Sequence, residues 1–250
     1  MPIDAGLAGS LAAQGIFKPA VYKRPLVGLI STGSELADGD APLAQGQIRN
    51  SNRYAFSAAL GKAGCNTLFL GVAQDDAAEI CRLLESAFPA CDALLITGGV
   101  SVGDYDLTPA AMEMAGVDIL VREVGLKPGM ACCHGIKHGK LVCGLSGNPA
   151  SALTNYYAVV QPAIKKLAGR RDAMPTNILV ELATAFPKKS RCDRLLRGKL
   201  TFSGGKVQIQ TQEMQGNVVL SSAIGCDAMA CIPAGSGPLE AGTELAAFLL

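Results

Sequence analysis

Residues 94–108, LLITGGVSVGDYDLT, join a buried-strand pattern to residues that could hold a charged ligand. The residues after the apolar run are mostly small or acidic: Gly98, Gly99, Val100, Ser101, Gly103, Asp104 and Asp106. Paired glycines let the backbone approach a ligand closely, with N–H groups free to bind an anion. Carboxylates beside such a cradle would repel a phosphate unless a cation lay between them. The segment therefore predicts a phosphorylated ligand bound together with a divalent metal ion.

Four further polar loops have a similar character. They span residues 31–36, 75–76, 126–129 and 144–149. Each also has an ordinary structural interpretation: Glu35 could be a first-turn acid, Asp76 could cap the next helix, and Lys127 could be an exposed turn residue. Because we expect all five loops at strand ends on one edge of one sheet, we interpret them together as a binding site.

The elements that must position these loops alternate between strand and helix patterns. We expect strands at 26–31, 67–72, 93–97, 118–124, 131–136 and 141–145. Helices are expected at 51–63 and 80–88. Two more are expected to begin at Thr108, which would be the N-cap, and after Asn148. This alternation predicts an α/β fold with a doubly wound, mostly parallel sheet, whose ligands bind at the carboxyl ends of the strands.

The pattern changes after residue 171. Short apolar runs then alternate with turn signals, and no helical period persists, so we expect a small all-β C-terminal domain. The predicted organisation is a weakly patterned N-terminal stub at 1–22, an α/β domain at 23–171 and a β domain at 172–250.

Composition excludes several classes of function. The 22 basic and 21 acidic residues leave a net charge of +1, which gives no reason to expect binding to nucleic acid or to an anionic membrane. No apolar run reaches the ~18 residues of a membrane helix, and the first residues lack the pattern of a signal peptide. Nine scattered cysteines without a CxxC motif suit reduced thiols, so we expect a cytoplasmic location.

One cysteine and histidine cluster could suggest zinc. It comprises Cys132, Cys133, His134, His138 and Cys143. Neighbouring residues on a strand point to opposite faces, so Cys132 and Cys133 could not easily share a metal ion. We therefore favour small buried side chains over a zinc site.

Taken together, the loop motifs closely resemble those of the molybdopterin molybdenumtransferase family, the MoeA and gephyrin E-domain type. The matching segments are STGSEL, GQIRNSN, TGGVSVGDYD, LKPGM and GLSGNPASAL. The resemblance implies a molybdopterin-binding, MoaB/Mog-like α/β domain. It further implies insertion of molybdate into adenylylated molybdopterin, with magnesium (Mg²⁺) assisting the release of AMP.

The resemblance also implies roles for individual residues. Glu35, Asp75 and Asp106 would be catalytic and would bind Mg²⁺, and Lys127 would hold an anion. The implied substrate-binding residues are Thr32, Gly33, Gly98, Gly99, Val100, Ser101, Gly103, Asp104, Pro128, Gly129, Ser146, Gly147, Asn148 and Pro149. A homodimer is expected, with a molybdopterin adenylyltransferase and apo-molybdoenzymes as further partners.

Some features depart from the family pattern. A further N-terminal region normally precedes the α/β domain. Glu123 and Met130 stand where basic residues are common in the family, and Ser146 stands where proline is common. We therefore expect the chain to bind the substrate but to turn it over poorly. Two alternatives remain. Asp106, Thr108 and Pro109 resemble a motif of the molybdopterin adenylyltransferases (MogA/MoaB type). The absent N-terminal region would also suit a non-catalytic molybdopterin-binding module.

Overall fold

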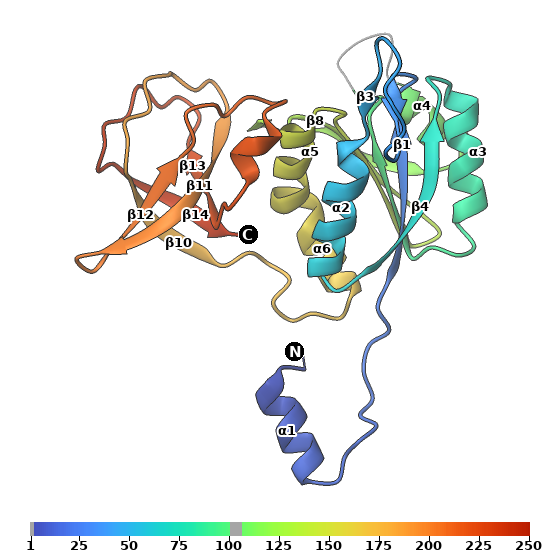
Figure 1. The fold of residues 1–250 in the computed structure, drawn as a ribbon, viewed down its shortest axis with the longest axis horizontal. Coiled ribbons are helices and arrows are strands. Elements are labelled where there is room, and N and C mark those ends of the chain that lie inside the picture. The colour runs from blue at the N-terminus through green and yellow to red at the C-terminus, as the bar shows by residue number, and fades with distance from the viewer. Residues whose placement is uncertain (1–2, 101–106) are drawn as a thin grey trace.

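The computed structural model describes residues 3–100 and 107–250, in which two large sheets dominate (Figure 1). The strand order of the first sheet is β4-β1-β5-β9-β8-β6. Its strands are β1 (Leu26–Thr32), β4 (Asn66–Ala73), β5 (Ala93–Thr97), β6 (Asp118–Glu123), β8 (Ala131–Lys137) and β9 (Lys140–Leu145). β1 runs parallel to β4 and β5, and β5 runs parallel to β9. Because β8 is antiparallel to both β9 and β6, it alone opposes the other five strands, and the predicted mostly parallel sheet is confirmed.

Helices cover both faces of this sheet. On one face lie α2 (Ser51–Lys62) and a long helix made of α5 (Pro149–Asn155), a π-helical turn η1 (Tyr156–Val160) and α6 (Gln161–Leu167). On the other face lie α3 (Ala77–Ala87) and α4 (Leu107–Met114). The doubly wound arrangement that the alternating pattern predicted is therefore present.

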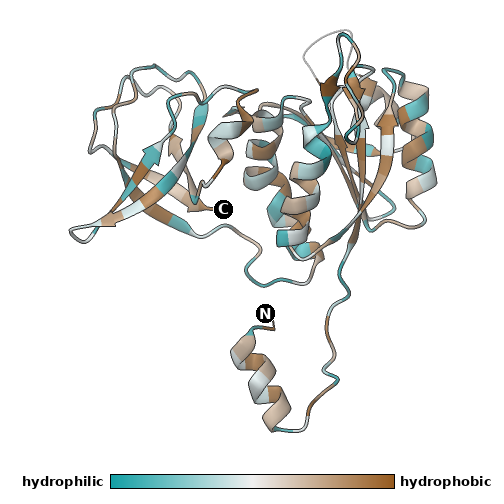
Figure 2. Cartoon of the chain, viewed as in Figure 1, coloured by the Kyte–Doolittle hydropathy of each residue, from teal (hydrophilic) through white to brown (hydrophobic). Residues whose placement is uncertain are grey.

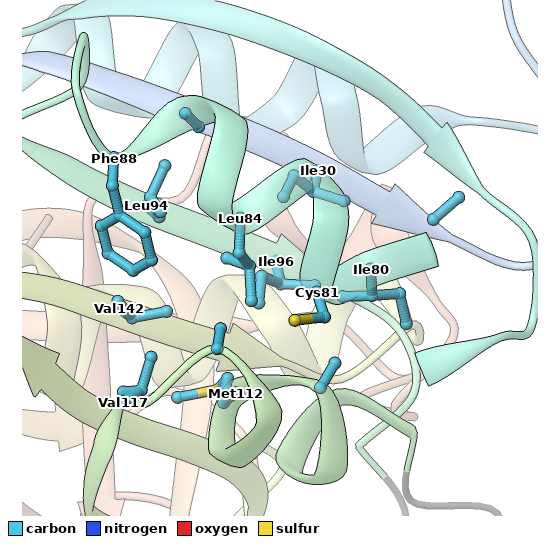
Figure 3. Close-up of a cluster of buried hydrophobic side chains, with 14 of the residues drawn as sticks. Ile30, Ile80, Cys81, Leu84, Phe88, Leu94, Ile96, Met112, Val117 and Val142 are labelled. Carbon is cyan, nitrogen blue, oxygen red and sulfur yellow. The ribbon is translucent and has the colours of Figure 1, made fainter. Parts of the chain in front are cut away.

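The alternation of side chains along the strands separates two hydrophobic cores. Leu95 of β5 packs towards α2 and the long helix, whereas Leu94 and Ile96 pack towards α3 and α4. Figure 3 shows the second of these cores, in which Leu84 of α3 meets the strand residues. Figure 2 shows the strands of the sheet largely in the hydrophobic colour, with hydrophilic positions on the covering helices. These cores fix the helices against the sheet and hold the strand ends in place.

The second sheet is built almost entirely from the C-terminal part of the chain. Its order is β12-β10-β14-β13-β11-β7, and a further β11–β12 pairing closes five of the strands on themselves. The strands are β10 (Asn177–Leu182), β11 (Asp193–Ser203), β12 (Lys206–Thr211), β13 (Ala228–Ile232) and β14 (Glu244–Leu249). The expected C-terminal β unit is thus present, together with one 3-10 turn, η2 (Leu220–Ala223), that the pattern did not predict.

The edge strand β7 (Leu126–Lys127) comes from the α/β part of the chain. It runs parallel to β11, with Leu126 opposite Asp193 and Lys127 opposite Arg194. The LKPG loop therefore follows a strand of the first sheet in the chain but pairs with a strand of the second sheet. The sequence pattern did not indicate this pairing.

Smaller elements complete the fold. Helix α1 (Ala5–Ala13) is capped by Asp4, buries none of its residues and lies away from both sheets in Figure 1. The short parallel strands β2 (Leu36–Ala37) and β3 (Ile48–Arg49) follow β1. In residues 3–100 and 107–250, no helix is long and apolar enough to span a membrane.

Thr108 does not have the N-cap role that we expected. It lies inside α4, where its hydroxyl donates to the carbonyl of Gly98 at 2.8 Å and its backbone N–H donates to Gly99 at 3.0 Å. The side chain therefore ties the helix to the glycine loop and accepts no capping hydrogen bond from α4.

Replacing Leu84 with alanine should test the core between α3 and the sheet. Leu84 is completely buried, so Leu84→Ala should lower the free energy of unfolding by about 2–5 kcal/mol, as measured by urea denaturation. Leu120→Ala is the control, because Leu120 is 60% exposed and its loss should change stability by no more than about 0.5 kcal/mol. Similar losses from both variants would contradict the packing described for α3.

Candidate functional site

A cavity of about 750 Å³ lies where the carboxyl ends of β1, β4, β5, β6 and β9 meet. It receives residues from all five loops that the sequence singled out. The predicted residues that line it are Thr32, Gly33, Glu35, Asp75, Gly98, Gly99, Val100, Lys127, Pro128, Gly129, Ser146, Gly147, Asn148 and Pro149. Ser101, Gly103, Asp104 and Asp106 lie outside the described residues. Every predicted site residue that the structure describes is thus brought to one cavity.

The paired glycines allow the ends of neighbouring strands to approach each other. Gly98 has φ +100°, and a Cβ there would lie 2.4 Å from the hydroxyl of Thr32. Gly99 has φ +63°, and its Cβ would lie 2.6 Å from the hydroxyl of Thr108. Both the conformation and the space therefore require glycine, and the backbone itself forms this wall of the cavity.

The acidic residues that the structure describes at the cavity come from the loops after β1 and β4. The Asp75 carboxylate accepts hydrogen bonds from the hydroxyl of Ser34 at 2.8 Å and from its N–H at 3.2 Å, which joins the two loops. Its neighbour Asp76 caps α3 by accepting from the N–H of Ala78. Asp76 therefore has the capping role that we considered from the sequence. Glu35 is exposed at the cavity and folds back over Gly33, where a Cβ would lie 2.6 Å from its carboxylate. Glu35 and Asp75 therefore both line the cavity, while Asp76 has a structural role.

Lys127 supplies a positive charge to the same cavity. Its side chain is exposed, whereas Pro128 and Gly129 after it are buried. Among the described residues, no carboxylate lies within ion-pair distance of its ammonium group. A cation without a local partner at the rim of a cavity can pair with an anionic ligand.

The start of α2 contributes site residues that the sequence reasoning did not include. Arg49, Asn50 and Asn52 all line the cavity. Asn50 caps α2 by accepting from the N–H of Arg53 and also bonds Ser31 at the end of β1, while Asn52 donates to the carbonyl of Gly147 at 2.9 Å. The RNSN sequence within GQIRNSN was the available signal, because closely spaced asparagines suit caps and loop contacts.

The C-terminal β unit closes one side of the cavity with Asn217 and Val218. This loop is held by Arg197 of β11, which is completely buried. The Arg197 guanidinium donates to Ser222, to the hydroxyl of Thr154 in α5 and to the carbonyl of Gly216. Burial lowers the pKa of Arg197. A single arginine in a β pattern gave no sequence signal of this role.

The structure gives the cysteine and histidine cluster a largely buried environment. Cys132 and Cys143 are buried, and burial raises the pKa of both thiols. His138 lies at the exposed hairpin turn between β8 and β9, away from the interior. Within the described parts of the chain, no three His, Cys, Asp or Glu residues are grouped so that they could hold a metal ion. Asp106, the third predicted magnesium ligand, lies outside the described residues.

The fold and cavity define an α/β ligand-binding protein whose site lies at the carboxyl edge of a parallel sheet and is completed by a closed β unit. Residues 28–166 match the family described as "Probable molybdopterin binding domain", and residues 180–250 match "MoeA C-terminal region (domain IV)". Since the first match covers more than half of the chain, the protein belongs to the molybdopterin-binding family, and the second match makes it of the MoeA type.

Similar proteins support the same assignment. A molybdopterin molybdenumtransferase of Staphylococcus aureus is 34% identical over 242 residues, which cover 96% of this chain and 57% of that protein. A molybdopterin molybdenumtransferase of Staphylococcus epidermidis is 31% identical, and the matched residues cover 97% of this chain and 58% of that protein. The crystal structure of a MoeA protein from Pyrococcus horikoshii has a TM-score of 0.81 at 30% identity and covers 98% of this chain and 59% of that one. The chain therefore spans less than two thirds of the length of these relatives.

The burial of His134 predicts a pH dependence of stability. Burial lowers the pKa of His134, although a hydrogen bond to Asn155 opposes the shift. Below about pH 6.5 an unfolded histidine takes up a proton that the folded state does not bind, so stability should fall as the pH falls towards the folded pKa. His134→Gln should show a shallower decline in unfolding free energy over this range. The exposed His138, the only other histidine, provides the control variant His138→Gln, and equal slopes in all three proteins would contradict the prediction.

Proposed function

We propose that this chain acts in molybdenum cofactor biosynthesis by binding adenylylated molybdopterin and inserting molybdate with release of AMP. The observation that carries the proposal is the cavity itself. Two acidic residues and two glycine loops converge there with Lys127, which has no ion-pair partner among the carboxylates that the structure describes. The names of the relatives, molybdopterin molybdenumtransferase and MoeA, support this activity over the transfer of an adenylyl group.

The donor groups of the cavity suit a phosphorylated and anionic substrate. The backbone at Gly98 and Gly99 can lie directly against phosphate oxygens, because no side chain intervenes. The N–H of Gly98 itself donates to the carbonyl of Leu145, so it is not available to the ligand. The start of the long helix at Asn148 and Pro149 faces the same cavity, and the positive end of the helix dipole there favours negative charge. Lys127 would fix a phosphate or the molybdate oxyanion as a point charge.

Glu35 and Asp75 would hold Mg²⁺ together with Asp106. Of these three residues, Asp106 lies outside the described part of the chain. Carboxylate oxygens are the ligands that this ion prefers, and the side chains of Glu35 and Asp75 line the cavity. When bound, Mg²⁺ would neutralise negative charge as the phosphoanhydride breaks. The protein's own contribution is to orient the substrate and exclude water, and the loop of Asn217 from the β unit helps to cover the cavity.

We further propose a homodimer in the cytoplasm that receives its substrate from a molybdopterin adenylyltransferase and supplies apo-molybdoenzymes. Residues 23–171 would form the substrate-binding unit, and residues 172–250 would cover it. Residues 1–22 would be the end of a linker.

The direct test is a single-turnover reaction with adenylylated molybdopterin, molybdate and Mg²⁺. AMP should be released only when molybdate is present, and EDTA should weaken substrate binding because the carboxylates tolerate phosphate only with a cation between them. Equal binding with EDTA and with Mg²⁺ would rule out the metal-bridged site. Formation of adenylylated pterin from molybdopterin and Mg-ATP would instead identify an adenylyltransferase.

Exchange of Lys127 for alanine tests the anion site separately from turnover. A charge-assisted hydrogen bond is worth about 1.5–3 kcal/mol, so Lys127→Ala should weaken the binding of molybdate or AMP by about one to two decades. Lys140→Ala is the matched control, because Lys140 lies at the far end of β9 and its ammonium contacts the carbonyl of Phe88. Isothermal titration calorimetry measures both affinities, and comparable losses would indicate only general electrostatics.

A further inference from the structure

A buried amide below the turn formed by Lys127, Pro128 and Gly129 connects three elements. Asn155 is the last residue of α5 and has no exposed surface. Its Nδ2 donates to the carbonyl of Gly129 at 2.8 Å, and its Oδ1 lies 3.2 Å from Nε2 of His134 on β8. One side chain therefore joins the long helix, the lysine turn and the first sheet.

The backbone of the turn rests directly on this asparagine. Gly129 has φ +111°, and a Cβ there would lie 3.1 Å from the backbone nitrogen of Asn155. Gly129 is therefore required by its conformation and by its close contact with the helix. The contact leaves little room for the turn to shift towards the helix.

The chemistry of the neighbours determines which way the amide of Asn155 points. The carbonyl of Gly129 can only accept a hydrogen bond, so it must face the NH₂ group of Asn155. The Oδ1 of Asn155 then accepts from His134, whose Nε2 must carry the proton. His134 is 6% exposed and its Nδ1 has no hydrogen-bond partner, as expected for a neutral imidazole with its proton on Nε2.

We propose that Asn155 is a positioning residue for the anion site: its amide, oriented by His134, holds Gly129 and thereby places Lys127 at the bound oxyanion. Asn155 does not line the cavity, so it acts through the turn. The other side of the turn is held by the ladder between Lys127 and Arg194 of β11. This inference rests on the proposed function only for the identity of the anion.

The test combines two measurements on Asn155→Leu, which keeps a similar volume and removes the hydrogen bonds of the amide to Gly129 and His134. The affinities for inorganic molybdate and for AMP should fall about three- to tenfold, the change expected for one net hydrogen bond. Amide hydrogen exchange at residues 126–130 should become faster. In the Lys127→Ala background the same substitution should cause no further loss of affinity, because the lysine that it positions is absent.

Control variants separate positioning from a general loss of stability. Ile164→Val changes a buried residue further along the same helix and should leave both affinities and the exchange of the turn unchanged. His134→Gln keeps a side-chain donor for Asn155, so it should retain more affinity than His134→Phe, which has none. This pair also provides the test if Asn155→Leu does not fold.

Unchanged affinity and unchanged exchange in Asn155→Leu would overturn the inference, as would an equal loss in Ile164→Val. If the unaltered protein binds neither molybdate nor AMP, the proposed function fails, and hydrogen exchange alone then decides the role of Asn155. Faster exchange at residues 126–130 would support positioning in that case, and unchanged exchange would overturn it.

Discussion

The common direction of five strands in the first sheet is the constraint on which the site depends. After one strand ends at the carboxyl edge, the chain must cross back to the amino edge before the next parallel strand can begin. Each strand that runs in this direction therefore ends with a loop at the carboxyl edge. Five polar loops that are separated by many residues in the sequence therefore share one cavity. The hydrophobic cores on the two faces contribute indirectly, because they hold the helices that set this direction.

Close approach of the strand ends follows from the same arrangement. Gly98 meets the backbone and hydroxyl of Thr32, and a Cβ at Gly144 would lie 2.9 Å from Thr108. Because side chains are absent at these points, backbone groups and a few short polar side chains form the base of the cavity. A cavity built in this way lets a ligand approach the backbone closely, without a flexible side chain between them.

The lysine turn couples the β unit to the site. Lys127 lies on an edge strand of the second sheet, and Arg197 of that sheet reaches Thr154 in the long helix, one residue before Asn155. A buried guanidinium is costly to leave without partners, so the bonds of Arg197 to Thr154, Ser222 and Gly216 favour one arrangement of the two parts. The β unit is therefore a structural part of the anion site as well as a neighbour of it.

The sequence by itself determined the six strands of the first sheet, the two-sided helical cover and the residues of the five loops, because these depend on local periodicity and on turn chemistry near each residue. Asp76, which caps α3, is a local feature of this kind. Only the tertiary structure decided that Leu126 and Lys127 join the second sheet, that Thr108 bonds Gly98 and leaves its expected capping role, and that Arg197 and Asn155 support the cavity. These outcomes depend on contacts between segments distant in sequence, where a single arginine or asparagine has no periodic neighbours to reveal its partner. The physical reason is that burial and hydrogen bonding are satisfied in three dimensions, whereas a sequence pattern records only what lies within a few residues along the chain.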